Sequence, residues 1–252
     1  MNIAVIGAGI GGLAVASLLH RAGHEVSVYE QAPRFARVGA GIQMAPNAMK
    51  VLRGLGIEER VRSIGFESGV ALSREWNTGE VTSELKLGRE VEERYGAPYL
   101  FLHRADLHAA IESVVAPGIV HLNTKLIGLE QRPDAVELTF ADGSKARADW
   151  VIGADGVHSL VREILLGPEQ PRFTGRVAYR TTFAASRLRG PIAPARTKWW
   201  GPDRHMVVYY VTKALDELYF VTSVPESAEW MTPESWSAKG DLEALRKAYA
   251  GF

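Results

Sequence analysis

The sequence predicts an α/β protein in which a Rossmann-like nucleotide-binding domain is interleaved with a mostly β domain. Three observations support this fold class. The chain begins with a strand pattern, a glycine-rich turn and an apolar helix, and a second such junction lies at 150–162. Stretches with period-two alternation of apolar residues interrupt this order at 69–97 and 167–252. Strand–turn–helix units are typical of parallel sheets, whereas strict alternation is typical of antiparallel strands.

The first junction has the glycine spacing of a dinucleotide-binding turn. Residues 3–6 form an apolar strand pattern, and Gly7, Gly9 and Gly12 follow in the order GxGxxG. These glycines permit a tight turn, close approach to a pyrophosphate, and helix–strand packing. The helix N-terminus then offers free N–H groups and a positive dipole end to an anion. A plain structural turn is the alternative.

A second strand with an acidic end follows this helix. The helix ends at Gly23, residues 26–29 form the strand, and Glu30 lies 18 residues after Gly12. A carboxylate at about this spacing accepts hydrogen bonds from ribose hydroxyls. The stretch 1–31 therefore predicts a βαβ nucleotide-binding unit.

Composition excludes several classes of protein. The chain has 252 residues, is 46% hydrophobic and 23% charged, and carries 29 basic and 29 acidic residues. This balance gives no reason to expect nucleic acid or an anionic membrane as a partner. The sequence has no cysteine, no apolar run long enough to span a membrane and no signal-peptide pattern. We expect no metal site and, by default, a cytoplasmic protein.

The remaining elements follow from periodicity and from turn residues. In the first half we expect a loop at 34–43 containing Gly39 and Gly41, helices at 46–56 and 57–64, and a hairpin at 70–87. Next come a strand at 99–102, a helix to 115, a strand at 119–122, three antiparallel strands at 125–148 and a buried strand at 150–153. The last part predicts strands at 177–183, 197–200, 205–212 and 218–224, and a helix at 241–249. The nucleotide-binding domain is expected at 1–68 and 98–166, and the β domain at 69–97 and 167–252.

These motifs together resemble the FAD-dependent aromatic hydroxylases of the para-hydroxybenzoate hydroxylase type, the class A flavoprotein monooxygenases. The matching features are the first glycine turn with Glu30, the segment Gly153-Ala-Asp155-Gly156 with Arg162, and His-Arg-Ala-Asp-Leu at 103–107. The resemblance implies a GR2-type FAD-binding domain combined with a β-sheet substrate domain. It also implies that the family's C-terminal third, with its Gly-Asp-Ala-X-His motif, is missing from this chain.

For FAD, the resemblance implies contacts with different parts of the cofactor. Gly11 and Glu30 meet the ADP half, Arg104 lies on the pyrophosphate side, Leu126 lies near the adenine, and Asp155 lies close to the phosphates. A turn acid with a structural role is the alternative for Asp155. The full set of expected FAD-binding residues is Gly7, Gly9, Gly11, Gly12, Glu30, Gln31, Arg104, Leu126 and Asp155.

For the substrate, the stretch 198–210 resembles the branch of the family that acts on hydroxylated pyridine carboxylates such as 6-hydroxynicotinate. The resemblance implies that NADH or NADPH reduces the flavin, that O2 forms a C4a-hydroperoxyflavin, and that the ring is hydroxylated with loss of CO2. The expected partner is thus a small aromatic or pyridine carboxylate. The alternatives are a salicylate hydroxylase-like enzyme and a nucleotide-binding remnant without turnover; a simple NAD dehydrogenase is disfavoured. Apolar surface left by the missing third leaves a homo-oligomer open.

His205, Tyr209 and Gln43 are the candidate catalytic residues. His205 and Tyr209 share one face of a strand and lie roughly 13 Å apart along it, so one substituted ring between them reaches both. The matching histidine and tyrosine lie in the active site of the resembled enzymes, and a histidine is a reasonable base for a ring hydroxyl. The alternative is a surface histidine and a core tyrosine.

Two departures from the family pattern leave the substrate open. Gln43 stands where the resembled enzymes carry a histidine base, and glutamine forms hydrogen bonds without accepting a proton. Arg196 stands in place of a cysteine, where it either anchors a carboxylate or is solvated.

Overall fold

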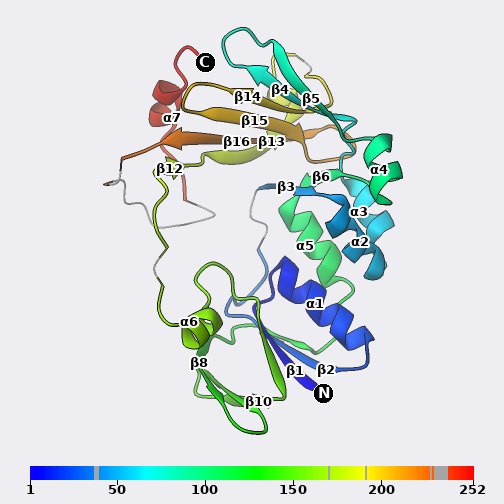
Figure 1. Cartoon of the computed structure of the whole chain (residues 1–252), viewed down its shortest axis with the longest axis vertical. Helices are drawn as coiled ribbons and strands as arrows, with labels where there is room; N and C mark the ends of the chain where they lie inside the picture. Colours follow the sequence, from blue (N-terminus) through cyan, green and yellow to red (C-terminus); the bar gives the residue numbers. More distant parts are fainter. Residues whose placement is uncertain (37–39, 170, 191, 228, 230–237) are drawn as a thin grey trace. The chain divides into compact units, whose positions relative to one another are not determined.

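The computed structural model describes residues 1–36, 40–169, 171–190, 192–227, 229 and 238–252 (Figure 1). They form two compact units, each with its own sheets. Unit 1 comprises Met1–Arg37, Gly54–Ile57 and Leu107–Pro171, and unit 2 comprises Val38–Arg53, Glu58–Asp106 and Arg172–Phe252. The domain limits expected from the sequence stay a prediction.

Unit 1 is built on a parallel sheet with strand order β11-β1-β2-β7. Because α1 buries Leu13 and Ala16 on one face, it packs as the crossover between β1 and β2. The expected βαβ unit is therefore confirmed. The bounds are β1 (Asn2–Ile6), α1 (Ile10–Arg21), β2 (Glu25–Tyr29), β7 (Val120–His121) and β11 (Trp150–Gly153).

A small antiparallel sheet completes unit 1, as the sequence predicts. Its order is β10-β9-β8, with β8 (Leu126–Gln131), β9 (Val136–Phe140) and β10 (Lys145–Ala148). The β9–β10 turn contains Gly143 at φ +84, and Asp142 accepts a hydrogen bond from the Ser144 N–H at 2.9 Å. Buried residues from both sheets and from α6 (Leu160–Leu166) form one core: Ala4, Ile6, Leu126, Leu138, Phe140, Ala148 and Val161.

Residues 150–153 form the predicted strand, but the prediction that this strand is buried is wrong. Trp150 is 63% exposed, and no residue of β11 is fully buried. The reason is topological: β11 is the edge strand of its sheet and pairs only with β1 among the described strands.

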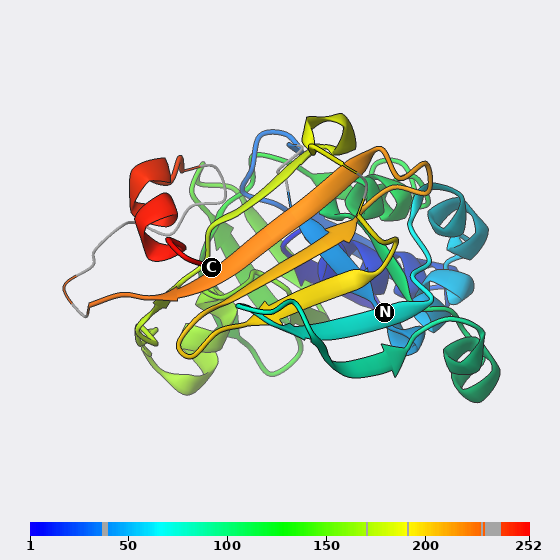
Figure 2. The same ribbon diagram turned by 90° about the horizontal axis from the view of Figure 1, so that it is seen from above.

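Unit 2 is dominated by a seven-stranded sheet (Figure 2). Its order is β12-β16-β15-β14-β4-β5, and β13 also pairs with β16. The β14–β4 pair is parallel, and the other pairs are antiparallel. The strands are β4 (Val70–Glu75), β5 (Val81–Lys86), β12 (Arg176–Val177), β13 (Arg180–Ala184), β14 (Arg196–Trp200), β15 (His205–Tyr210) and β16 (Glu217–Pro225).

A two-stranded antiparallel sheet of β3 (Gly41–Met44) and β6 (Leu100–His103) corrects the expected loop at 34–43. Residues 41–43 are strand because their backbone groups pair with β6, about sixty positions later in the chain. No local pattern reports such a partner. Gly39, expected in the same loop, lies outside the described residues.

The helices of this part of the chain are short. They are α2 (Pro46–Gly54), α3 (Glu58–Ile64), α4 (Arg89–Tyr95), α5 (Arg104–Glu112), α7 (Leu242–Ala248) and the 3-10 turn η1 (Ala185–Arg187). No helix was predicted at 88–97, where α4 lies. Helix α4 buries no residue, and its C-cap is Gly96 with φ 72. The other α-helices lie where helices were expected, whereas η1 was not predicted.

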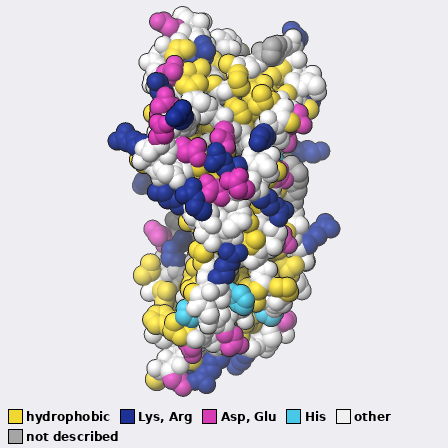
Figure 3. All heavy atoms as spheres, turned by 90° about the vertical axis from the view of Figure 1, so that its right-hand side faces the viewer, with side chains coloured by type: hydrophobic (Ala, Val, Ile, Leu, Met, Phe, Trp, Pro, Cys, Tyr) yellow, Lys and Arg dark blue, Asp and Glu magenta, His cyan; other side chains and the backbone are white. Residues whose placement is uncertain are grey.

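Acidic and basic side chains alternate on the face over α3 and α4 (Figure 3). Arg62 pairs with Glu67 at 3.0 Å and with Glu92 at 2.9 Å, and Arg89 pairs with Glu93. Such exposed pairs contribute little to stability. The pair of Arg53 and Glu58 differs, because Glu58 is only 8% exposed.

Replacing Gly12 with alanine destabilises the chain by about 1–3 kcal/mol, because overpacking forces a well-packed backbone apart. A Cβ atom on Gly12 would lie 1.9 Å from the Gly7 carbonyl oxygen, whereas one on Gly11 meets nothing within 4 Å. Gly11→Ala is therefore the control and leaves stability unchanged or slightly raised. Urea unfolding of both variants measures the difference; equal effects would contradict the packing argument.

Glu58→Gln lowers Tm by about 2–4 °C at neutral pH, whereas Glu93→Gln in the exposed Arg89 pair leaves Tm unchanged. The hydrogen bond from Arg53 holds the pKa of Glu58 below its ordinary value of 4.5. The contribution of the pair is therefore fully present above about pH 4.5 and is lost as the pH falls through the lower pKa of the folded state. Thermal unfolding of both proteins across this pH range tests the prediction. The loss of Tm caused by E58Q is expected to shrink on acidification, and a loss that grows would contradict it.

Candidate functional site

The glycine turn of unit 1 is fixed by close backbone contacts. Gly7 has φ +100, and a Cβ atom there would lie 2.4 Å from the Ala154 carbonyl oxygen. Beyond it, Gly9 and Gly11 face open space. Packing therefore requires glycine at positions 7 and 12, whereas the backbone of Gly9 and Gly11 stays open to a ligand at the N-terminus of α1.

Glu30 ends β2 beside this turn. Its carboxylate accepts hydrogen bonds from the Ala8 N–H and the Ala32 N–H, both at 2.8 Å. Each carboxylate oxygen keeps a further lone pair, because an ionised carboxylate has about four acceptor positions. Glu30 therefore holds the turn in place and retains acceptor capacity for hydroxyl groups. Gln31, the next residue, is exposed.

The sequence analysis missed one residue that supports the same turn. The Nε2 atom of His108 lies 2.8 Å from the Ala8 carbonyl oxygen, and its ring packs against Phe35 with centroids 4.6 Å apart. His108 lies on α5, a hundred positions from Ala8. Its place directly after the 103–107 motif was the only signal in the sequence.

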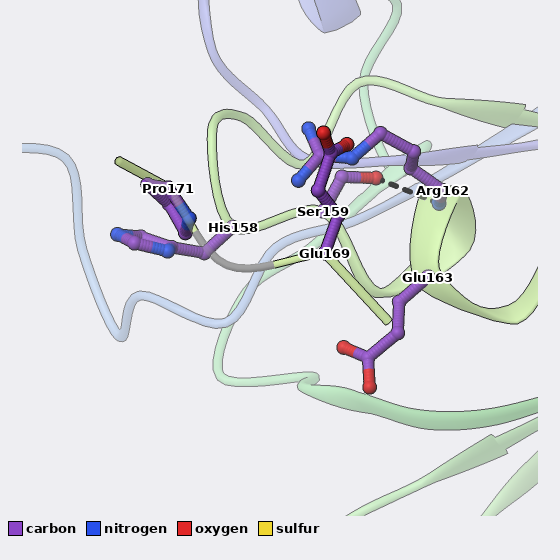
Figure 4. Close-up of a pocket in the computed structure, with 6 residues that line it drawn as sticks. All are labelled: His158, Ser159, Arg162, Glu163, Glu169 and Pro171. Atoms are coloured by element: carbon purple, nitrogen blue, oxygen red, sulfur yellow. Dashed lines mark hydrogen bonds between the residues drawn. The ribbon is translucent and has the colours of Figure 1, made fainter. Parts of the chain in front are cut away.

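Asp155 follows β11 at the same carboxyl edge of the parallel sheet. Its carboxylate accepts hydrogen bonds from the Ser159 hydroxyl at 2.5 Å and from the Val161 N–H at 3.1 Å, so it holds the start of α6. A small hollow of about 70 Å³ lies next to it, lined by His158, Ser159, Arg162, Glu163, Glu169 and Pro171 (Figure 4). It is far too small for a dinucleotide.

Two other expected FAD contacts have distinct settings. Leu126 is 7% exposed and belongs to the core of unit 1. Arg104 is the first residue of α5 and belongs to unit 2, where its N–H donates to the Ala40 carbonyl oxygen at 2.8 Å. Within unit 1, the structure brings the glycines, Glu30 and Asp155 to one sheet edge.

These residues fit the AMP half of a dinucleotide. Ligands of open parallel sheets bind beyond the carboxyl ends of the strands, where neighbouring connections leave in opposite directions. β1 lies between β2 and β11, and the turns after β1 and β11 touch at Gly7 and Ala154. Open glycine backbone, a helix N-terminus and an acid at the end of β2 meet there, as pyrophosphate and ribose require.

In unit 2, strand register collects polar side chains on one face of the large sheet. Lys198 lies opposite Val207, and Trp200 opposite His205. Tyr209 lies opposite Tyr219 on the next strand. Because directly paired residues share a face and alternate residues return to it, this polar face contains Arg196, Lys198, Trp200, His205, Tyr209 and Tyr219.

Three phenols and an amide gather at one end of the polar face. The Tyr99 hydroxyl donates to Gln43 Oε1 at 3.0 Å, and the rings of Tyr209 and Tyr219 lie 5.2 Å apart. Gly41 makes room for both rings, since a Cβ there would lie 2.6 Å from Tyr219 and 2.8 Å from the Tyr209 hydroxyl. The structure thus brings Gln43 to Tyr209, and it adds Tyr99 and Tyr219, which the sequence analysis missed.

Burial governs the protonation of these phenols. Desolvation raises the pKa of Tyr209 well above its ordinary value, against a hydrogen bond with Gln43 and the charge of Arg196. Desolvation also raises the pKa of Tyr99 and of Tyr219. All three phenols are therefore neutral hydrogen-bond donors at neutral pH.

His205 lies at the other end of the face. Its ring packs on Trp200 with centroids 5.3 Å apart, and its carbonyl oxygen accepts the Tyr249 hydroxyl at 2.7 Å. Burial first, and then the charges of Lys198, Arg176 and Arg196, lower the pKa of His205. The imidazole is therefore neutral near pH 7 and able to accept a proton. Lys198 itself lies over the Trp200 ring at 3.3 Å.

The cations of this face act on one another. Burial lowers the pKa of Arg196 and of Lys198, and the charge of Arg196 lowers that of Lys198 further. Neither side chain has a carboxylate partner among the residues that the structure describes. A face with unpaired cations, phenol donors and a neutral imidazole suits an anionic aromatic ligand.

Within the described ranges, no group of three or more His, Asp or Glu side chains is placed to hold a metal ion. Among the same residues, no helix combines the length and the apolar character that crossing a membrane requires.

Lys198→Met raises the pKa of His205, because it removes a positive charge next to the imidazole. In the wild type this pKa lies below the ordinary value of 6.5. NMR titration of the imidazole carbon resonances measures the change, and Lys145→Met on β10 of unit 1 is the control with no expected effect. An unchanged or lowered His205 pKa in K198M would contradict the assigned cause.

Comparison with known proteins shows the family of the chain. A family model described as "FAD binding domain" matches residues 1–238. The 6-hydroxynicotinate 3-monooxygenase of Bordetella bronchiseptica is 45% identical over 252 residues, which are 100% of this chain and 65% of that protein. The enzyme of the same name from Pseudomonas fluorescens is 43% identical over 253 residues, again 100% of this chain and 65% of that protein. The chain thus spans about 65% of the length of these curated relatives.

A solved structure supports the same placement. Klebsiella pneumoniae HpxO, complexed with FAD and uric acid, superposes with a TM-score of 0.86 at 27% identity. The match covers 100% of this chain and 62% of that one. The resemblance drawn from the motifs is confirmed: the chain belongs to the FAD binding domain family and is similar to class A flavin hydroxylases.

Proposed function

We propose that this chain forms the FAD-binding part and most of the substrate-binding part of an aromatic monooxygenase that acts on a hydroxylated pyridine or benzene carboxylate. The observation that carries the proposal is the polar face of unit 2, where cations that have no acid partner among the described residues lie among phenols and a neutral histidine. The similarity to two 6-hydroxynicotinate 3-monooxygenases supports 6-hydroxynicotinate, or a close analogue, as the substrate.

The residues of unit 1 have separate tasks in this proposal. The backbone at Gly9 and Gly11 meets the pyrophosphate of FAD, and Glu30 accepts the ribose hydroxyls. Asp155 lies close to the phosphates, Arg104 lies on the pyrophosphate side, and Leu126 lies near the adenine. When bound, FAD supplies reduction by NADH or NADPH and the activation of O2, which no side chain provides.

The residues of unit 2 prepare the substrate. His205 accepts the proton of the ring hydroxyl, which makes the ring carbon more nucleophilic. Tyr209 is a neutral donor that holds a substrate oxygen, and Gln43 orients Tyr99 and Tyr209 without taking a proton. Hydroxylation at the carbon that bears the carboxylate releases CO2.

Incubation of the 252-residue chain with FAD tests the proposal. Flavin absorption bands near roughly 370 and 450 nm are expected to stay with the protein after desalting. NADH oxidation is then expected to rise with 6-hydroxynicotinate and not with salicylate. No retained flavin would identify a remnant without turnover, and stimulation by salicylate would identify a salicylate hydroxylase-like enzyme.

His205→Ala tests the assigned base. We expect kcat/KM to fall by about 10²–10⁴, the usual contribution of a general base. His20→Ala, on the exposed side of α1, is the matched control and keeps wild-type turnover. Turnover by H205A that equals the control would remove the base role from His205.

A further inference from the structure

We propose that Arg196 is the carboxylate anchor of the substrate site and binds the carboxylate side-on through Nε and one terminal nitrogen. This inference rests on the proposed function and deepens it, because it assigns a recognition task to a residue at which the chain departs from the resembled enzymes. The sequence alone left Arg196 open between an anchor and a solvated side chain.

The side chain of Arg196 is partly buried, and one of its donors has no partner among the described residues. The Nε atom of Arg196 is inaccessible to solvent and has no hydrogen-bond acceptor in the described part of the chain. The backbone N–H of the same residue does have one, the Ser68 hydroxyl at 3.3 Å. A buried donor without an acceptor is costly, so structures normally supply one from protein, water or ligand. A solvated surface arginine would not have this environment.

Within the described residues, no carboxylate balances the charge of Arg196. The groups that act most strongly on Arg196 are the phenols of Tyr99 and Tyr209, which are neutral at physiological pH. Elsewhere in unit 2, Arg62 of α3 pairs with Glu92 and Arg89 of α4 pairs with Glu93. The charge of Arg196 is therefore available to a group that the described part of the chain does not supply.

The position of Arg196 in the sheet also favours the anchor role. Arg196 begins β14 on the polar face, two residues before Lys198. The phenols of Tyr99 and Tyr209 lie close enough to act on the charge of its guanidinium, and both interact with Gln43. An anion bound at Arg196 therefore has phenol groups nearby. It also relieves the repulsion that lowers the pKa of Lys198.

The chemistry of the orphaned atom selects the anion. A planar guanidinium binds a planar carboxylate through two parallel N–H bonds, and the Nε–Nη edge is one of its two such faces. A ring oxyanion has a single oxygen and leaves one of the two donors without a partner. The carboxylate of the substrate is therefore the group assigned to Arg196, and the ring hydroxyl is left to His205.

Equilibrium binding to the flavin-free full chain tests the anchor without turnover. The ligands are 6-hydroxynicotinate, its carboxamide, which has the same shape without the charge, and 2-hydroxypyridine, which lacks the carboxylate. Calorimetry, or quenching of the fluorescence of Trp200 on the same face, reports the affinity. We expect the wild type to prefer the carboxylate to the carboxamide by roughly 30-fold or more.

Arg196→Gln is expected to abolish this preference, because it weakens only the binding of the carboxylate ligand, again by roughly 30-fold or more. Arg196→Lys keeps the charge without the planar pair of donors and is expected to lie between R196Q and the wild type. Arg189→Gln, at an exposed position seven residues earlier, is the control and leaves all three affinities unchanged. Circular dichroism and thermal unfolding check that the variants fold.

The outcomes separate the two proposals. Equal wild-type affinity for carboxylate and carboxamide, or retained preference in R196Q, overturns the anchor while the monooxygenase proposal stands on flavin retention and turnover. Binding of 2-hydroxypyridine as tightly as 6-hydroxynicotinate would place a ring oxygen at Arg196 and also overturns the anchor. Failure of every aromatic ligand to bind the wild type overturns both proposals. The wild-type comparison needs no variant, so it decides even if R196Q does not fold.

Discussion

The register of β15 between β14 and β16 is the constraint on which the candidate substrate site depends. Trp200 lies opposite His205, and Tyr209 opposite Tyr219, so one face receives the polar side chains of three strands. A slip of one residue would turn every side chain of β15 to the other face. The phenol cluster, the histidine and the cations are therefore placed together or not at all.

Close backbone packing makes this arrangement specific. Gly41 brings β3 against the rings of Tyr209 and Tyr219, which puts Gln43 within reach of Tyr99. The same principle operates separately in unit 1, where the Gly7 backbone touches Ala154. In both units a glycine permits a backbone contact that a Cβ atom would prevent. The polar groups next to that glycine therefore have fixed positions.

The charges of the two surfaces of unit 2 have different consequences. Over α3 and α4, opposite charges pair in contact with water, where their interactions contribute little. On the polar face, Arg196 and Lys198 are partly desolvated, and burial lowers the pKa of both. Cations held in this way interact more strongly with an added anion, because the local dielectric is lower than that of water. Charge recognition is thus concentrated on the sheet face.

The sequence by itself determined the local features: the βαβ unit at Gly7–Gly12, the acid at the end of β2, the strand that contains His205 and Tyr209, and the family. These follow from periodicity, turn residues and motif spacing, which are read along the chain. Only the tertiary structure decided the exposure of Trp150, the strand at Gly41–Met44, the contacts of Tyr99 and His108, and the burial of Arg196 Nε without an acceptor among the described residues. Each of these depends on partners from fifty to more than a hundred positions away, or on the edge of a sheet, and no local pattern reports either.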